Sequence, residues 1–193
     1  MCTFLYKFSM SKRTMKIYSP NIFLIILVAF FTAAPGIHAA QYNSASNVNP
    51  QAFFSPGGGC TEAILKAVSQ ARTEILIMAY SFHSPAIAQA LIAAHKRGVK
   101  VSMILDKSER QEGLTPPIQM FQAGIPVYLD GTHAVMNNRL IIIDGQTIIT
   151  GSFNFNAASE NMNAENLLII QAKELAASYR ENWLHHKKHS ISF

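Results

Sequence analysis

Short apolar runs alternate with segments of helical periodicity along most of the chain. The apolar runs have the length of buried strands and cover residues 74–81, 99–105, 125–129, 140–143, 147–150 and 166–171. The helical segments repeat apolar residues every three or four positions and cover residues 61–72, 85–97, 117–123 and 172–186. Strand–helix–strand passages that lead into a hairpin, a strand and a last helix predict an α/β fold, a mixed β-sheet flanked by helices.

Turn and capping residues indicate where these elements begin and end. Ser84 followed by Pro85 is typical of a helix N-cap and first helical position, and Gly98 after two basic residues is typical of a helix stop. Asp144 and Gly145 separate two apolar runs, which predicts a β-hairpin. The polar, proline-containing residues 107–116 are expected to form a loop.

The first forty residues have the three parts of a secretory signal peptide. Four Lys and Arg side chains precede an apolar run at residues 22–34, and a small-residue end follows. Met1, Met10 and Met15 are alternative starts, and a later start would shorten the basic part. A membrane anchor is the alternative, but a spanning helix needs ~20 apolar residues and this run is shorter. We therefore expect export to the periplasm or beyond, with no stable membrane span after cleavage. The expected parts are a signal peptide (1–40), a flexible leader (41–50), the folded domain (51–189) and a tail (190–193).

Removal of residues 1–40 would lower the net charge of the chain. The whole chain of 193 residues is 49% hydrophobic and 14% charged, with a net charge of +5, so it can form a core. Without residues 1–40 it keeps twelve Lys and Arg against eleven Asp and Glu, a net charge of +1. A uniformly basic nucleic-acid-binding surface is therefore not expected, although a local patch fits this balance. Cys60 would remain as the only cysteine, either as a small apolar core residue or as an intermolecular link.

Polar side chains gather in the last third of the chain. Alternation along a strand places Asn137 and Arg139 on one face, and Arg139 offers a permanent forked cation suited to phosphate. Ser152 and Asn154 follow the next strand directly, where Gly151 would let the backbone approach a ligand. This chemistry fits a phosphate site, and it also fits a solvated turn with Asx hydrogen bonds.

The spacing of these residues adds a second argument. The chain reads Asn137-Asn138-Arg139, then Asp144 after four residues, then Gly151-Ser152-Phe153-Asn154 after six more. This resembles the signature of the phospholipase D superfamily, His-x-Lys-(four)-Asp-(six)-Gly-Ser-x-Asn. The resemblance extends over residues 50–186 to the small, exported bacterial endonucleases of the Nuc type, through segments 55–60, 79–82, 96–99 and 163–166. It implies a phospholipase D-like fold with one motif per chain.

The resemblance also implies a phosphodiesterase that uses neither a metal nor another cofactor. In that family one His attacks phosphorus to give a phosphohistidine, a second His protonates the leaving oxygen, and Lys, Ser and Asn hold the phosphate. A chain with one motif would complete the site as a homodimer, with the two motifs meeting at the two-fold axis. Nucleic acid, DNA or RNA, is the expected partner, and lipid is the alternative.

The chain departs from the motif at both catalytic positions. Asn137 stands where the family has the nucleophilic His, and Arg139 stands where it has Lys. A carboxamide is a poor nucleophile and does not titrate near neutral pH, so we expect severely impaired catalysis. His133 is a possible substitute nucleophile, although an extended strand would place it ~13 Å from residue 137 at ~3.3 Å per residue.

The two acids of the motif and the histidines near the C-terminus have separate interpretations. Asp144 has a structural reason to exist in its turn, whereas Glu165 corresponds to the family acid that orients the His ring and is expected to pair with Arg139 instead. The histidine-rich residues 185–189 are expected to be a solvated helix end, with metal or nucleic-acid binding as the alternative.

Three functions follow from the sequence. The first is an exported nuclease with weak or lost activity, and the second is a catalytically dead protein that grips phosphodiesters through Arg139, Ser152 and Asn154. The third is hydrolysis of lipid phosphodiesters, the activity that names the superfamily. Turnover separates the first from the second, and substrate choice separates both from the third.

Overall fold

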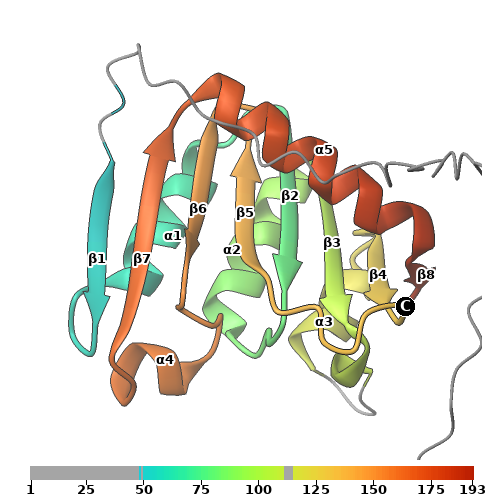
Figure 1. Cartoon of the computed structure of the whole chain (residues 1–193), viewed down its shortest axis with the longest axis horizontal. Coiled ribbons are helices and arrows are strands. Elements are labelled where there is room, and N and C mark those ends of the chain that lie inside the picture. The colour runs from blue at the N-terminus through green and yellow to red at the C-terminus, as the bar shows by residue number, and fades with distance from the viewer. Residues whose placement is uncertain (1–47, 49, 111–114) are drawn as a thin grey trace, which may run out of the picture. The chain divides into compact units, whose positions relative to one another are not determined.

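A computed structural model describes residues 48, 50–110 and 115–193, and these residues form one mixed β-sheet flanked by helices (Figure 1). The predicted signal peptide, residues 1–40, and nearly all of the predicted leader lie outside the described residues. Within the described ranges, no helix has the length and apolar character that crossing a membrane requires. The α/β fold expected from the hydrophobic pattern is confirmed.

The sheet has eight strands. They are β1 (Gln51–Ser55), β2 (Glu74–Ala79), β3 (Lys100–Asp106), β4 (Val127–Asp130), β5 (Arg139–Ile143), β6 (Thr147–Gly151), β7 (Glu165–Gln171) and β8 (Ile191–Ser192). Their order across the sheet is β1-β7-β6-β5-β2-β3-β4-β8. Strands β2, β3 and β4 are parallel, because helices connect them, and every other neighbouring pair is antiparallel.

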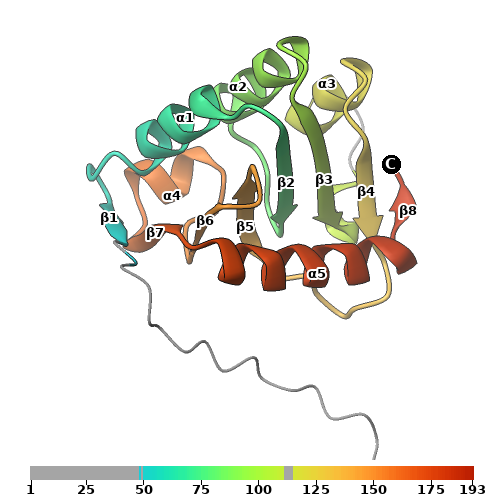
Figure 2. The same ribbon diagram turned by 90° about the horizontal axis from the view of Figure 1, so that it is seen from above.

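Helices cover both faces of the sheet. They are α1 (Cys60–Gln70), α2 (Pro85–Lys96), α3 (Pro116–Gln122), α4 (Ala157–Asn161) and α5 (Lys173–His189), with a short 3₁₀ helix η1 (Lys107–Glu109). Figure 2 shows α1, α2 and α3 over one face and α5 across the other. The Ser84 hydroxyl caps α2 by accepting the Ile87 N–H at 3.3 Å, as the Ser-Pro pair predicts.

Alternation along the central strands divides the core into two parts. In β2, Ile75 and Ile77 belong to the cluster under α1 and α2, whereas Leu76 and Met78 pack toward α5. Trp183 of α5 is buried in the second cluster, and its indole N–H donates to the carbonyl of Ile77 at 2.9 Å. Burial on both faces explains why β2 reads as a continuous apolar run.

The structure differs from the sequence prediction mainly near the C-terminus. Residues 190–193 were expected to be a tail, but they contain β8, which pairs with β4, and the Phe193 N–H donates to the carbonyl of Val127 at 2.9 Å. Helix α5 continues to His189 instead of ending near residue 186, and α4 was not predicted. A two-residue strand and a five-residue helix are too short to show a periodicity in the sequence.

Candidate active site

Three neighbouring inner strands bring the motif residues together at one end of the strands (Figure 1). Because β5, β6 and β7 are successively antiparallel, the start of β5, the end of β6 and the start of β7 lie together. Arg139 is the first residue of β5, Ser152 follows the last residue of β6, and Glu165 opens β7. The structure thus places the two halves of the motif and its acid side by side.

Two buried aromatic rings fix the segment after β6. Phe153 and Phe155 are each 1% exposed and alternate with the half-buried Ser152 and Asn154. The ring of Phe155 meets Phe82 edge-on, with 6.0 Å between the centroids. Since successive side chains of an extended segment point in opposite directions, burying the two rings directs Ser152 and Asn154 away from the core.

Arg139 is held between two carboxamides. Its Nε donates to Oδ1 of Asn154 at 2.8 Å, and its Nη1 donates to Oδ1 of Asn137 at 2.7 Å. The ring of Tyr80 lies 5.7 Å from the guanidinium carbon, close enough for a cation–π contact. Arg139 forms no ion pair with any Asp or Glu in the described part of the chain. Neutral groups therefore position its charge.

Glu165 pairs with Ser152, and the expectation that it pairs with Arg139 is wrong. Its Oε2 accepts from the Ser152 hydroxyl at 2.5 Å and its Oε1 from the amide of Asn163 at 2.9 Å. The Ser152 bond is the main cause of a lowered pKa of Glu165; partial burial opposes it, and Asn163 and the charge of Arg139 add to it. The Nε and Nη1 donors of Arg139 are directed at Asn154 and Asn137, and no ion pair joins its guanidinium to Glu165 among the described residues.

Gly151 allows two strands to approach each other closely. A Cβ at this position, where φ is 151°, would lie 2.2 Å from the backbone oxygen of Asn166. The same oxygen accepts the N–H groups of Ser152 and Phe153 at 3.1 and 3.2 Å. Glycine is therefore needed here for contact with β7, whereas the sequence suggested room for a ligand.

Comparisons with known proteins identify the family. Residues 64–187 match the family described as Cardiolipin synthase, PLD-like domain. Over 171 residues the chain is 36% identical to a phospholipase D of Rickettsia conorii, which covers 88% of this chain and 86% of the relative. The chain belongs to the phospholipase D superfamily.

Solved structures of the superfamily share the fold. The chain is 35% identical to Nuc of Salmonella typhimurium, a phospholipase D family member, with a TM-score of 0.71 over 76% of this chain and 98% of Nuc. NucT from Helicobacter pylori has the same fold, with a TM-score of 0.69 and 22% identity over 76% of this chain and 99% of NucT. The predicted phospholipase D-like fold of the single-motif, Nuc-like kind is confirmed.

The motif aspartate of the superfamily, here Asp144, fastens the β5–β6 turn to the start of β2. Its carboxylate accepts the N–H groups of Arg72, Thr73 and Glu74 at 3.0, 2.7 and 3.0 Å, and the Thr73 hydroxyl at 2.9 Å. Burial raises the pKa of Asp144, but these hydrogen bonds outweigh it and hold the pKa below its ordinary value. All these partners belong to the scaffold, and Arg139 is not among them.

We expect Asp144→Ala to lower the free energy of unfolding by about 1.5–3 kcal/mol, because three backbone donors lose a charged acceptor. Alanine is also disfavoured at φ 53°. Asp144→Asn is the matched control; it keeps one acceptor oxygen and tolerates this backbone, so its loss should be less than half as large. Urea titration followed by circular dichroism measures both. Equal losses would show that the hydrogen bonds do not determine the effect.

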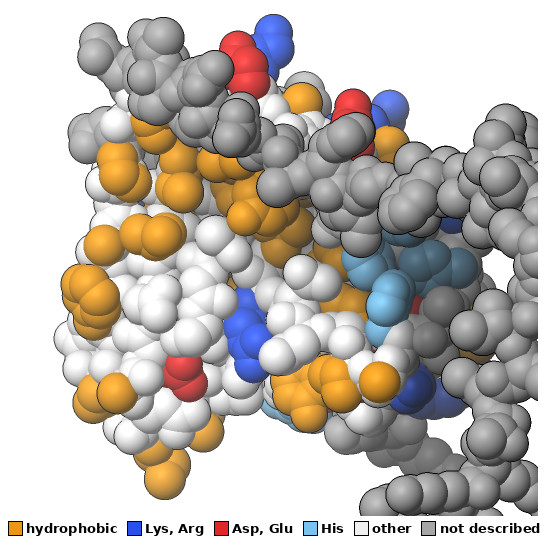
Figure 3. Space-filling view, in the orientation of Figure 1, with side chains coloured by type: hydrophobic (Ala, Val, Ile, Leu, Met, Phe, Trp, Pro, Cys, Tyr) orange, Lys and Arg blue, Asp and Glu red, His pale blue; other side chains and the backbone are white. Residues whose placement is uncertain are grey.

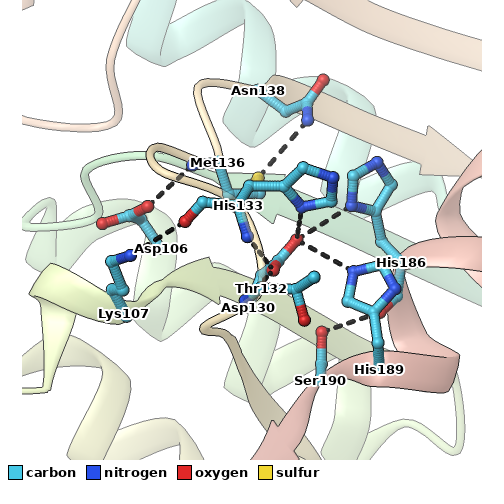
Figure 4. A network of polar contacts seen from close by, with 10 residues as sticks. All are labelled: Asp106, Lys107, Asp130, Thr132, His133, Met136, Asn138, His186, His189 and Ser190. Carbon is cyan, nitrogen blue, oxygen red and sulfur yellow. Dashed lines mark hydrogen bonds and ion pairs between the residues drawn. The ribbon is translucent and has the colours of Figure 1, made fainter.

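Asp106, at the end of β3, holds the loop that leads into the motif and was not among the predicted site residues. It is 3% exposed, and its carboxylate accepts the N–H of Met136 at 2.7 Å, which fixes the residue just before Asn137 (Figure 4). The hydroxyl and N–H of Ser108 donate to its other oxygen at 2.6 and 2.9 Å. A lone Asp at the end of a buried strand was the available signal, but its partner lies thirty residues away.

His133 lies in a different cluster from the motif. Its Nδ1 is 2.9 Å from Oδ2 of Asp130, and its backbone oxygen accepts from the Lys107 ammonium at 2.9 Å. Residues 131–138 contain no strand, so the extended path assumed for the 13 Å estimate is absent. No hydrogen bond within the described residues joins His133 to Asn137 or Arg139.

One group of described residues is arranged closely enough to hold a metal ion. It consists of Asp130, His133, His186 and His189, and no residue of the motif belongs to it.

Proposed function

We propose that this chain is an exported phosphodiesterase of Nuc-type endonuclease ancestry that still binds phosphodiesters but has a severely impaired hydrolytic step. Binding depends on Arg139 and Asn154, with Ser152 beside them. The impairment follows from Asn137, which occupies the position of the nucleophilic His. Export depends on residues 1–40 acting as a signal peptide, which would deliver the protein to the periplasm or the medium.

The orientation and contacts of the Arg139 guanidinium are the main support for this proposal. The guanidinium is oriented by Asn137 and Asn154, faces an aromatic ring and forms no ion pair with a carboxylate among the described residues. This fixed guanidinium is suited to a phosphate oxygen, because it keeps a permanent charge and its Nη2 donates to no group of the described residues, while Nε and Nη1 are engaged by the two carboxamides. It also supplies the electrostatic stabilisation that phosphoryl transfer needs.

The same contacts explain why the chemical step should fail. Attack on phosphorus requires a nucleophile that can then be displaced by water, and the amide of Asn137 offers neither a reactive lone pair nor a titratable proton. In a symmetric dimer the nucleophile and the general acid would be lost together. Glu165, which in the superfamily would orient the imidazole, is held by Ser152 and Asn163.

Nucleic acid is the substrate class we favour. The chain is 35% identical to Nuc over nearly the whole of that protein. On the face drawn in Figure 3, the visible Lys and Arg side chains are scattered and do not form a stripe. A homodimer would double the phosphate contact by bringing two copies of Arg139 to one axis.

Lipid phosphodiesters are the second candidate. The relative of R. conorii is named a phospholipase D and matches 86% of its own length. Both substrate classes would present a phosphodiester to the same guanidinium. They differ only in the groups attached to the phosphate, which are nucleosides in one class and lipid in the other. Vesicles containing phosphatidylcholine or cardiolipin therefore belong in the same assays as oligonucleotides.

We expect Arg139→Gln to weaken binding of a single-stranded oligonucleotide by ~10–100-fold, which corresponds to the loss of ~1.5–3 kcal/mol from a charged hydrogen bond. Arg139→Lys should lose less, since it keeps the charge without the fork. Fluorescence anisotropy in excess chelator measures both. Lys66→Gln removes the same charge from the exposed surface of α1 and is the control. An unchanged affinity in Arg139→Gln would contradict the proposed binding role.

A further inference from the structure

Three histidine side chains converge on one carboxylate oxygen of Asp130 (Figure 4). Asp130 ends β4, His133 lies three residues later, and His186 and His189 are one turn apart on α5. The Nδ1 atoms of His133 and His186 are each 2.9 Å from Oδ2 of Asp130, and Nε2 of His189 is 3.2 Å from it. Figure 3 shows the histidines gathered near the C-terminal end of α5.

The arrangement has the dimensions of a metal site. The four ligand atoms lie within 4.8 Å of one another. In tetrahedral zinc sites with bonds of ~2.0–2.1 Å, ligand atoms are ~3.3 Å apart. The nitrogens of His133, His186 and His189 lie 2.9, 2.9 and 3.2 Å from the Asp130 oxygen, close to that spacing. Three imidazoles and a carboxylate suit Zn²⁺ better than Mg²⁺ or Ca²⁺, which prefer oxygen ligands.

The charges around the cluster favour a cation. The side chain of Asp130 is 0% exposed, and its ion-pair partners within the described ranges are the three histidines, with no Lys or Arg. Burying a charged carboxylate costs free energy unless its charge is compensated. Without a metal ion, the three imidazoles can compensate it only by donating ring N–H groups. Lys107, the lysine drawn in Figure 4, donates to the backbone oxygen of His133 and not to the Asp130 carboxylate.

Further contacts hold the ligands in place. The second oxygen of Asp130 accepts the N–H of Thr132 at 3.0 Å, which turns Oδ2 toward the histidines. The Ser190 hydroxyl donates to the backbone oxygen of His186 at 2.8 Å, at the end of α5. Such outer contacts orient ligands in natural metal sites.

We propose that Asp130, His133, His186 and His189 form a structural zinc site that clamps the end of α5 to β4 and to the loop leading into the motif. Four protein ligands leave no position for substrate, so the site is closed and not catalytic. This proposed zinc site differs from the expectation that residues 185–189 form a solvated helix end, and it agrees with the metal-binding alternative. The difference arises because α5 extends far enough to bring His189 to the cluster.

The first test uses the purified native protein after treatment with chelator and buffer exchange. Calorimetric titration with Zn²⁺ should give one ion per chain with a dissociation constant below ~1 μM. At about 100 times that constant the melting temperature should rise by ~5–10 °C. Co²⁺ should give the intense visible bands of tetrahedral coordination. Absence of saturable binding by the native protein would overturn the proposal whatever the variants do.

The second test assigns the ligands. His186→Ala/His189→Ala should weaken zinc binding by at least ~100-fold, since it removes two of four ligands. His185→Ala is the matched control, because this neighbouring histidine lies outside the group and should leave the affinity unchanged. If the double variant does not fold by circular dichroism, His189→Gln replaces it with the same expectation. Native-like affinity in the ligand variant, or equal loss in the control, would overturn the assignment. Zinc binding is measured without oligonucleotide, so failure of the zinc proposal does not depend on whether Arg139 binds phosphodiesters.

Discussion

Replacing Asn137 with His and Arg139 with Lys is expected to raise the rate of phosphodiester cleavage by at least ~10²-fold. General acid–base catalysis alone contributes ~10²–10⁴-fold, and the covalent route returns with the imidazole. The rest of the site is already in place, because Asn154, Ser152 and Glu165 lie at the same end of the strands as residues 137 and 139. Cleavage of plasmid DNA, of an RNA oligonucleotide and of lipid vesicles in excess chelator measures the gain and identifies the substrate class.

Controls separate restored chemistry from restored folding. Asn137→Gln keeps a carboxamide at the same position and should remain as inactive as the native chain. Adding Glu165→Gln to the double variant should remove much of the gain, because the acid would then no longer orient the new imidazole. A native chain that cleaves as fast as the double variant would contradict our interpretation of Asn137. Inactivity of every variant on every substrate would contradict the proposed hydrolytic ancestry of the site.

Asp106→Ala is expected to lower the free energy of unfolding by about 3–5 kcal/mol. The carboxylate is 3% exposed and accepts three hydrogen bonds of 2.6–2.9 Å, so its removal leaves the buried N–H of Met136 without an acceptor. Thermal and urea unfolding measure the loss. Asp106→Asn is the matched variant, which keeps one acceptor oxygen and should lose about half as much. A loss below ~1 kcal/mol would show that the loop before Asn137 is not held by this contact.

The same residue predicts how stability depends on pH. Burial raises the pKa of Asp106, but the hydrogen bonds from Ser108 and Met136 and the charge of Lys107 outweigh it and lower the pKa. A carboxyl whose pKa is lower in the folded state stabilises the fold above its unfolded pKa of ~3.9. That contribution disappears as the pH falls through the lower, folded pKa. Between pH 6 and 3 the native protein should therefore lose more stability than Asp106→Asn, and parallel curves would contradict this.

Local sequence patterns were sufficient for most of the fold. Apolar runs such as those of β2 and β3 are long enough to be recognised, and the Asp144-Gly145 turn determines how β5 meets β6. The motif residues could be placed together from the sequence, because a hairpin brings the start of its first strand next to the end of its second strand. Periodicity could not show β8 or α4, because neither completes a repeat.

Contacts between distant segments could not be read from the sequence. The partner of Glu165 depends on how β6 and β7 align, and that register determines that Ser152 reaches it first. The zinc-binding geometry joins Asp130 to histidines 56 and 59 positions away. Such pairings are set by packing of α5 across the sheet, for which the chain offers no local signal.

The most direct measurement for the central claim is a search for a covalent intermediate. An internally labelled oligonucleotide is incubated with the native protein and with the Asn137→His/Arg139→Lys variant in excess chelator. The reaction is quenched in alkaline denaturant, because a phosphorus–nitrogen bond is labile in acid. We predict a labelled protein band for the variant, mapped by mass spectrometry to residue 137, and none for the native chain. A labelled band on the native chain, at His133 or elsewhere, would show that it retains a working nucleophile and would contradict the account.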